Sequence, residues 1–73
     1  MDDRTILDTV SDNIRMERIK QRISQEKFAE MVDISTTYLS MVENRKANPS
    51  ILVVIKICMA LDVSLDTIYK FKN

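Results

Sequence analysis

Apolar residues recur along this chain at intervals of three and four, and no segment alternates strictly between apolar and polar positions. Such spacing gives a helix one apolar face, whereas strict alternation would indicate a half-buried strand. The pattern therefore predicts an all-α protein, a compact bundle of five helices. Residues 5–9 can extend the first helix, because Ile6 continues the four-residue spacing of Val10 and Ile14. The five expected helices cover about residues 11–21, 25–32, 36–44, 51–61 and 65–71.

Serine residues and one proline mark the expected helix boundaries. A serine before an apolar-periodic segment can cap the helix by accepting a hydrogen bond from a free backbone N–H. Pro49 disfavours helical backbone in the residue before it, so we expect a loop over residues 45–49. The chain has no glycine, so helix ends that need left-handed backbone must use other residues. The expected capping residues are Ser24, Ser35, Ser50 and Ser64.

Composition excludes several functional classes. The chain has 73 residues, one cysteine and no histidine, the commonest general base and metal ligand. We therefore expect no enzyme activity, no metal site and no cofactor, and we interpret Cys58 as a buried structural thiol. The longest apolar run, residues 51–55, is too short to span a bilayer, and the acidic N-terminus is unlike a signal peptide. These features predict a cytoplasmic protein with no membrane partner.

Net charge gives little guidance to the partner. The chain carries 11 Lys and Arg residues and 11 Asp and Glu residues, whereas nucleic-acid-binding proteins tend to be basic. Residues 1–13 are mainly acidic, and residues 14–56 carry more bases than acids. A basic middle segment is compatible with an anion-binding face, but composition alone does not indicate DNA.

The most specific pattern lies between residues 25 and 44. Two short helices joined by a short turn must cross at a steep angle. Ala29 supplies a small residue at the crossing, and Asp33 belongs to the few non-glycine types that tolerate positive φ in the turn. The apolar residues expected to fill the angle between these helices and the rest of the protein are Phe28, Val32, Ile34, Leu39 and Val42.

This segment resembles the helix-turn-helix of the lambda-repressor/Cro type, which includes the xenobiotic-response-element regulators. Glycines common in that family at four helix ends are replaced here by Arg22, Asp33, Arg45 and Asp62. The resemblance implies a single domain over residues 1–73, with a core at about 10–70 and an N-terminal extension at 1–9. The stretches that resemble the family's other helices are IRMER at 14–18, ISQE at 23–26, NPS at 48–50 and ICMALDVSL at 57–65.

The resemblance implies that the third helix enters the major groove of double-stranded operator DNA. Thr36, Thr37 and Met41 are then expected to contact base edges, with Ser40 as a further candidate. No Arg, Asn or Gln precedes Asn44 on this face, so we expect modest direct readout together with recognition of DNA shape. The alternative is an ordinary solvated helix face.

The resemblance also implies contacts to the DNA backbone and one structural ion pair. Gln25 resembles the family glutamine that bonds a phosphate, and a helix N-terminus favours such an anion. Arg18 lies four residues after Ile14, and Glu43 lies four residues after Leu39, so both are expected on or near an inward face. They resemble the Arg–Glu pair that joins the first and third helices in this family. Arg18 can also approach a phosphate. The other expected backbone contacts are Tyr38, Asn44, Arg45 and Lys46.

The fourth expected helix has more apolar residues than a core requires. Leu52, Ile55 and Met59 form a second apolar stripe beside the expected core residues. An unused stripe on a small protein usually marks a contact surface, here a homodimer interface completed by Leu65, Tyr69 and Phe71. The alternative is that Ile6 and Leu7 or the C-terminal tail cover the stripe within one chain. The expected core residues of this helix are Ile51, Val54, Ile57, Cys58 and Leu61.

These expectations describe a homodimeric, sequence-specific transcriptional regulator. It would be a repressor or a controller of the phage, restriction-modification or antitoxin type. Dimer symmetry would match a palindromic operator with half-sites about 34–36 Å apart. The alternative is a protein-interaction module of the same fold that binds its partner through the apolar surface of the fourth and fifth helices.

Overall fold

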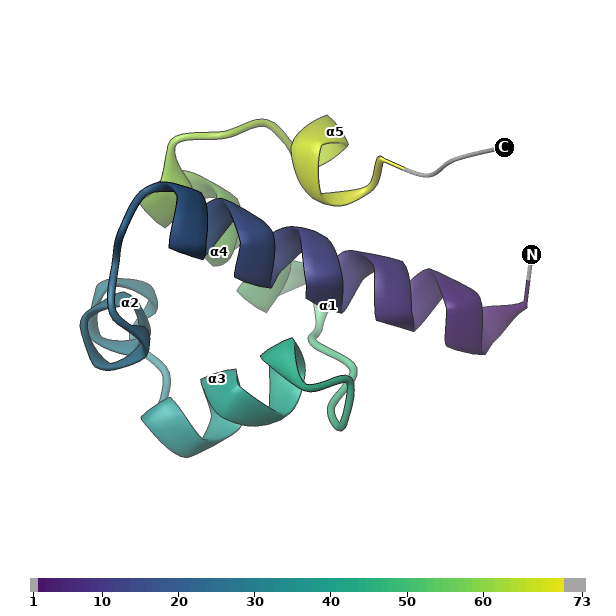
Figure 1. Cartoon of the computed structure of the whole chain (residues 1–73), viewed down its shortest axis with the longest axis horizontal. Helices are drawn as coiled ribbons and strands as arrows, with labels where there is room; N and C mark the ends of the chain where they lie inside the picture. Colours follow the sequence, from purple (N-terminus) through teal and green to yellow (C-terminus); the bar gives the residue numbers. More distant parts are fainter. Residues whose placement is uncertain (1, 71–73) are drawn as a thin grey trace.

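The structure is a computed structural model that describes residues 2–70, and within this range it contains helices and no strand. The all-α prediction is therefore confirmed. In Figure 1, α1 crosses the molecule, α3 lies below it, α2 lies at the left end, α4 lies behind and α5 lies above. The helices are α1 (Asp3–Lys20), α2 (Gln25–Val32), α3 (Thr36–Glu43), α4 (Ile51–Leu61) and α5 (Leu65–Ile68).

The first helix is longer than the main expectation, because α1 begins at Asp3 rather than near residue 11. Asp2 caps it, with Oδ1 accepting a hydrogen bond of 2.8 Å from the Thr5 N–H. This bond lowers the pKa of Asp2 below its ordinary value, because it stabilises the carboxylate. The expected N-terminal extension thus belongs to α1 itself from Asp3 onward.

Serine capping occurs at three of the four expected positions. The side chains of Ser24, Ser35 and Ser50 each accept from the backbone N–H three residues later. The capping bond expected of Ser64 is absent, because the Thr67 N–H donates instead to the Ser64 carbonyl oxygen at 3.1 Å. The last helix is also shorter than expected and ends at Ile68.

All four residues that replace family glycines have left-handed backbone. The φ angles are 59° at Arg22, 62° at Asp33, 65° at Arg45 and 56° at Asp62. A non-glycine residue in this region costs about 1 kcal/mol, because its Cβ approaches the neighbouring carbonyl oxygen. The fold therefore requires left-handed backbone at these four helix ends, even though glycine would adopt it without this cost.

The core lies between α1, α2, α3 and α4 and is closed by α5. Asn13 of α1 fixes α5, because its Nδ2 donates to the Ile68 carbonyl oxygen at 2.7 Å. One expected core residue was predicted wrongly: Ile51 is 58% exposed, because it stands at the first turn of α4 with the exposed stripe rather than with Val54. Ile34 is half-buried against the core. The buried apolar residues are Val10, Ile14, Phe28, Ala29, Val32, Leu39, Val42, Val54, Ile57, Cys58, Leu61 and Ile68.

No helix within residues 2–70 combines the length and the apolar character needed to cross a membrane.

Candidate nucleic-acid interface

The turn between α2 and α3 has the geometry expected of a helix-turn-helix. Asp33 ends α2 in the left-handed conformation, and the next residue, Ile34, donates its N–H to the Ala29 carbonyl oxygen at 3.0 Å. Ala29 is buried at 2% exposure, which allows close packing at the crossing. Figure 1 shows α2 nearly end-on while α3 lies lengthwise, so the two helices cross steeply. Ser35 then begins α3.

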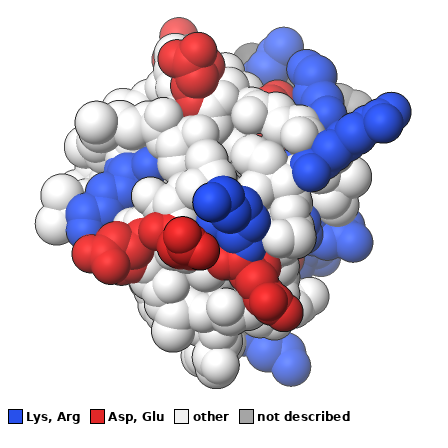
Figure 2. Space-filling model, turned by 90° about the vertical axis from the view of Figure 1, so that its left-hand side faces the viewer, with Lys and Arg blue, Asp and Glu red and all other residues white. Residues whose placement is uncertain are grey.

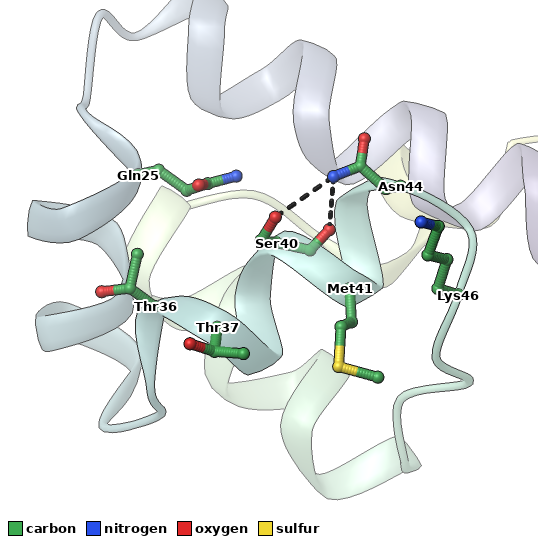
Figure 3. Close-up of a pocket in the computed structure, with 7 residues that line it drawn as sticks. All are labelled: Gln25, Thr36, Thr37, Ser40, Met41, Asn44 and Lys46. Atoms are coloured by element: carbon green, nitrogen blue, oxygen red, sulfur yellow. Dashed lines mark hydrogen bonds between the residues drawn. The ribbon is translucent and has the colours of Figure 1, made fainter.

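The outer face of α3 forms the floor of an open depression of about 400 Å³. Thr36, Thr37 and Met41 are exposed on it, and Ser40 is half-buried. Figure 3 shows these side chains on one side of α3, with Gln25 at one end and Lys46 at the other. The structure thus brings together the residues expected to contact bases and three of those expected to contact phosphates, Gln25, Asn44 and Lys46.

A buried ion pair holds α3 against α1. Arg18 Nε lies 2.7 Å from Glu43 Oε2, and Arg18 Nη2 lies 2.9 Å from Glu43 Oε1. Arg18 Nη1 also donates to the Ile23 carbonyl oxygen at 2.8 Å, in the turn that leads to α2. Two parallel hydrogen bonds between charged groups fix both distance and orientation. The pair therefore sets the position of the outer face of α3 relative to the other helices.

Gln25 belongs to the same network, which the sequence pattern did not indicate. Its Nε2 lies 3.2 Å from Glu43 Oε1, so the side-chain amide nitrogen points toward α3. The Glu43 carboxylate can only accept hydrogen bonds, so the amide atom of Gln25 that faces it must be the donor, Nε2. Gln25 is thus oriented at the N-terminus of α2, where backbone N–H groups favour an anion.

Arg45 is paired with α1, a contact that sequence reasoning missed. Its Nη2 lies 2.6 Å from Asp12 Oδ2, its Nε lies 3.1 Å from Asp12 Oδ1, and its Nη1 lies 3.8 Å from Asp8 Oδ2. Hydrogen bonding to Asp12 raises the pKa of Arg45 above its ordinary value. The one sequence feature that could have indicated this contact was the four-residue spacing of Asp8 and Asp12, which places both carboxylates on one face of α1. A phosphate contact by Arg45 would require it to leave Asp12.

The remaining candidates for phosphate contact differ in availability. Tyr38 is half-buried against the core. Lys46 is exposed, and within residues 2–70 it has no acidic partner, so its ammonium group is available. The Asn44 amide nitrogen donates hydrogen bonds to the carbonyl and side-chain oxygens of Ser40, so it is already engaged.

Charge is distributed unevenly around this site. Figure 2 views the left-hand side of Figure 1, where α2 lies, and shows acidic side chains across the middle of that surface with basic side chains beside them. The exposed acids of α2 and its C-cap are Glu26, Glu30 and Asp33. Exposed bases lie close to these acids, Lys27 in the same helix and Arg22 just before it, so this end of the molecule carries both signs of charge.

The second candidate surface is apolar and lies on α4 and α5. Leu52 is 61% exposed and Met59 is 76% exposed, so the described residues leave most of both side chains uncovered. Ile55, Met59 and Leu65 border a depression of about 600 Å³, whose lining includes Cys58. Burial raises the pKa of the Cys58 thiol, because the thiolate would lose hydration. Tyr69 is 36% exposed, and Phe71 lies outside the described residues.

The chain is similar over most of its length to known proteins. A family model described as helix-turn-helix matches residues 14–68. Control protein C.MunI of Mycoplasma sp is 34% identical over 55 residues, which cover 75% of this chain and 74% of that protein. The restriction-modification controller protein C.AhdI from Aeromonas hydrophila has a TM-score of 0.83 and 25% identity, over 86% of this chain and 96% of that chain. The wild-type restriction-modification controller protein C.Esp1396I has a TM-score of 0.81 and 27% identity, over 93% of this chain and 95% of that chain.

Proposed function

Because this chain belongs to the helix-turn-helix family, we propose that it is a sequence-specific DNA-binding transcriptional regulator of the restriction-modification controller type. The observation that carries the proposal is the outer face of α3. It is an exposed, uncharged, polar surface, held by the buried Arg18–Glu43 pair and flanked by Gln25 and Lys46. These are the features that a helix needs in order to enter a major groove.

We assign base contacts to the outer face of α3 and phosphate contacts to its two ends. Threonine hydroxyls donate or accept, and the methyl groups of Thr36, Thr37 and Met41 can contact thymine methyls. Gln25 and Lys46 contact phosphates directly. Arg45 becomes a further phosphate contact only after it leaves Asp12. So few cationic contacts give a shallow dependence of affinity on salt.

We assign homodimer formation to the apolar surface of α4 and α5. Leu52, Ile55, Met59 and Leu65 are all at least 39% exposed, although each is a large apolar side chain. A twofold axis through this surface would present two copies of α3 to a palindromic operator with half-sites about 34–36 Å apart. Repression follows where such an operator overlaps a promoter. The proposal places the protein in the cytoplasm and gives it no catalytic role, cofactor or metal.

Selection of bound DNA from a random pool tests this proposal. A twofold-symmetric consensus, retarded in gels more strongly at 50 mM than at 200 mM salt, is the expected result. A pool that shows no enrichment and no salt-sensitive retardation would contradict it.

One observation favours a second candidate, a protein-interaction module that uses the α4 and α5 surface. The net charge is +0, and α2, which packs against α3, carries the exposed acids Glu26 and Glu30. In that case the protein would bind no DNA at either salt concentration.

A further inference from the structure

Asn44, at the end of α3, is hydrogen bonded to Ser40 one helical turn earlier. Asn44 Nδ2 lies 2.8 Å from the Ser40 carbonyl oxygen and 3.2 Å from Ser40 Oγ (Figure 3). A carbonyl oxygen can only accept, so the amide atom that faces it must be the nitrogen. The backbone of α3 therefore determines the orientation of the Asn44 amide.

This orientation determines the polarity of the Ser40 hydroxyl. The amide nitrogen can only donate, so Ser40 Oγ accepts from it and the hydroxyl hydrogen points away from Asn44. A helical hydroxyl can donate to the carbonyl four residues earlier, as Thr9 does to Thr5 at 2.8 Å. Among residues 2–70, the Ser40 hydroxyl donates to no protein group. Its hydrogen is therefore available to a ligand in the depression.

We propose that Asn44 is a positioning residue that makes Ser40 a hydrogen-bond donor to a base in the major groove. This inference rests on the proposed function and replaces the phosphate contact expected of Asn44. Guanine, adenine and thymine each present an acceptor in the major groove, whereas cytosine presents only its amino group. Ser40 thus disfavours cytosine at one position of each half-site.

The position of Ser40 favours a base over a phosphate as the acceptor. Ser40 lies on α3 between Thr36 and Met41 in chain order, in the part of the depression that separates Gln25 from Lys46 (Figure 3). Side chains that face the groove from a recognition helix, above all in its N-terminal part, reach base edges, whereas residues that flank the helix contact the backbone.

Selection from a random pool with four proteins tests the inference: wild type, Ser40→Ala, Asn44→Ala and the double variant. We expect wild type to disfavour cytosine at one position per half-site. Each single variant should weaken that discrimination roughly 2- to 10-fold, the effect of one neutral hydrogen bond. The double variant should weaken it no further, because both changes remove the same interaction.

Asn44→Asp gives a sharper test, because it reverses the polarity of the pair. The carboxylate accepts the Ser40 hydrogen, which leaves only lone pairs on Ser40 Oγ. The preferred base at that position should then shift to adenine or cytosine, whose amino groups donate. Asn48→Asp is the matched control, because it adds the same charge at an exposed loop residue outside the pair. It should lower affinity for all sequences alike.

Two outcomes would overturn the inference alone. One is a uniform loss of affinity for every sequence in Ser40→Ala, which would place Ser40 on a phosphate. The other is an unchanged base preference in Asn44→Ala and Asn44→Asp, with thermal melts showing both variants folded. If wild type itself enriches no DNA, the proposed function fails, and this inference fails with it.

Discussion

Arg18 of α1 and Glu43 of α3 are joined by two hydrogen bonds of 2.7 and 2.9 Å, and the Glu43 side chain is only 1% exposed. If Glu43 is removed, Arg18 keeps its charge on a side chain that is only 13% exposed and has lost its carboxylate partner. We expect Glu43→Ala to lower the free energy of unfolding by about 3–5 kcal/mol, the usual cost of breaking a buried pair from one side. Urea denaturation followed by circular dichroism measures this change.

An exposed ion pair on α2 provides the control for that experiment. Lys27 and Glu30 lie 3.9 Å apart with side chains 62% and 77% exposed. Because water screens such a pair, Glu30→Ala should change the free energy of unfolding by less than about 1 kcal/mol. Similar losses in the two variants would contradict a structural role for the Arg18–Glu43 pair.

The left-handed backbone at Asp33 predicts the effect of restoring a glycine. Asp33→Gly removes the conflict between Cβ and the backbone at φ 62°, but it gives the unfolded chain more freedom. We expect the variant to be neutral or up to about 1 kcal/mol more stable in thermal melts. Glu30→Gly, inside α2, should instead cost about 1 kcal/mol. A melting temperature several degrees below wild type for Asp33→Gly would refute the interpretation of this turn.

The contact between Arg45 and Asp12 predicts that an acidic residue of α1 weakens DNA binding. Asp12→Asn removes the negative charge that lies 2.6 Å from the guanidinium, which weakens this contact and favours the movement of Arg45 to a phosphate. We expect tighter DNA binding and a log–log salt slope steeper by about 0.9, the contribution of one further phosphate. Fluorescence anisotropy at several salt concentrations measures both quantities.

Asp3→Asn is the matched control, because it removes the same charge from the first turn of α1 and leaves Arg45 paired. It should raise the affinity slightly and leave the salt slope unchanged. Equal slopes for Asp12→Asn and Asp3→Asn would mean that Arg45 gains no phosphate contact.

The apolar surface of α4 predicts which substitution separates the subunits. Met59 is 76% exposed, so Met59→Lys should leave the folded chain intact but bury an unpaired charge in a dimer interface. We expect the dimer dissociation constant to rise at least tenfold in sedimentation experiments, roughly 1.4 kcal/mol. Met16→Lys is the control, since Met16 is 64% exposed on α1. Two variants with the same sedimentation behaviour would exclude α4 as the interface.

Local features of the sequence were sufficient to locate most helices and the helix-turn-helix. Gln25–Val32 and Ile51–Leu61 have the predicted bounds, because apolar periodicity and a serine cap act within a few residues. Left-handed backbone at Asp33 follows from the same short-range chemistry. The face of α3 that bears Thr36, Thr37 and Met41 was predicted by resemblance, and it is exposed.

Only the tertiary structure decided which polar side chains are already occupied. Arg45 meets Asp12 across 33 positions of the chain, and Gln25 meets Glu43 across 18. Such partners depend on which helices face each other and at what angle, and periodicity carries no information about that. The exposure of Ile51 at the first turn of α4 was likewise decided by packing. Sequence therefore determined where the helices form, and packing determined which of their charges and apolar side chains remain free to bind.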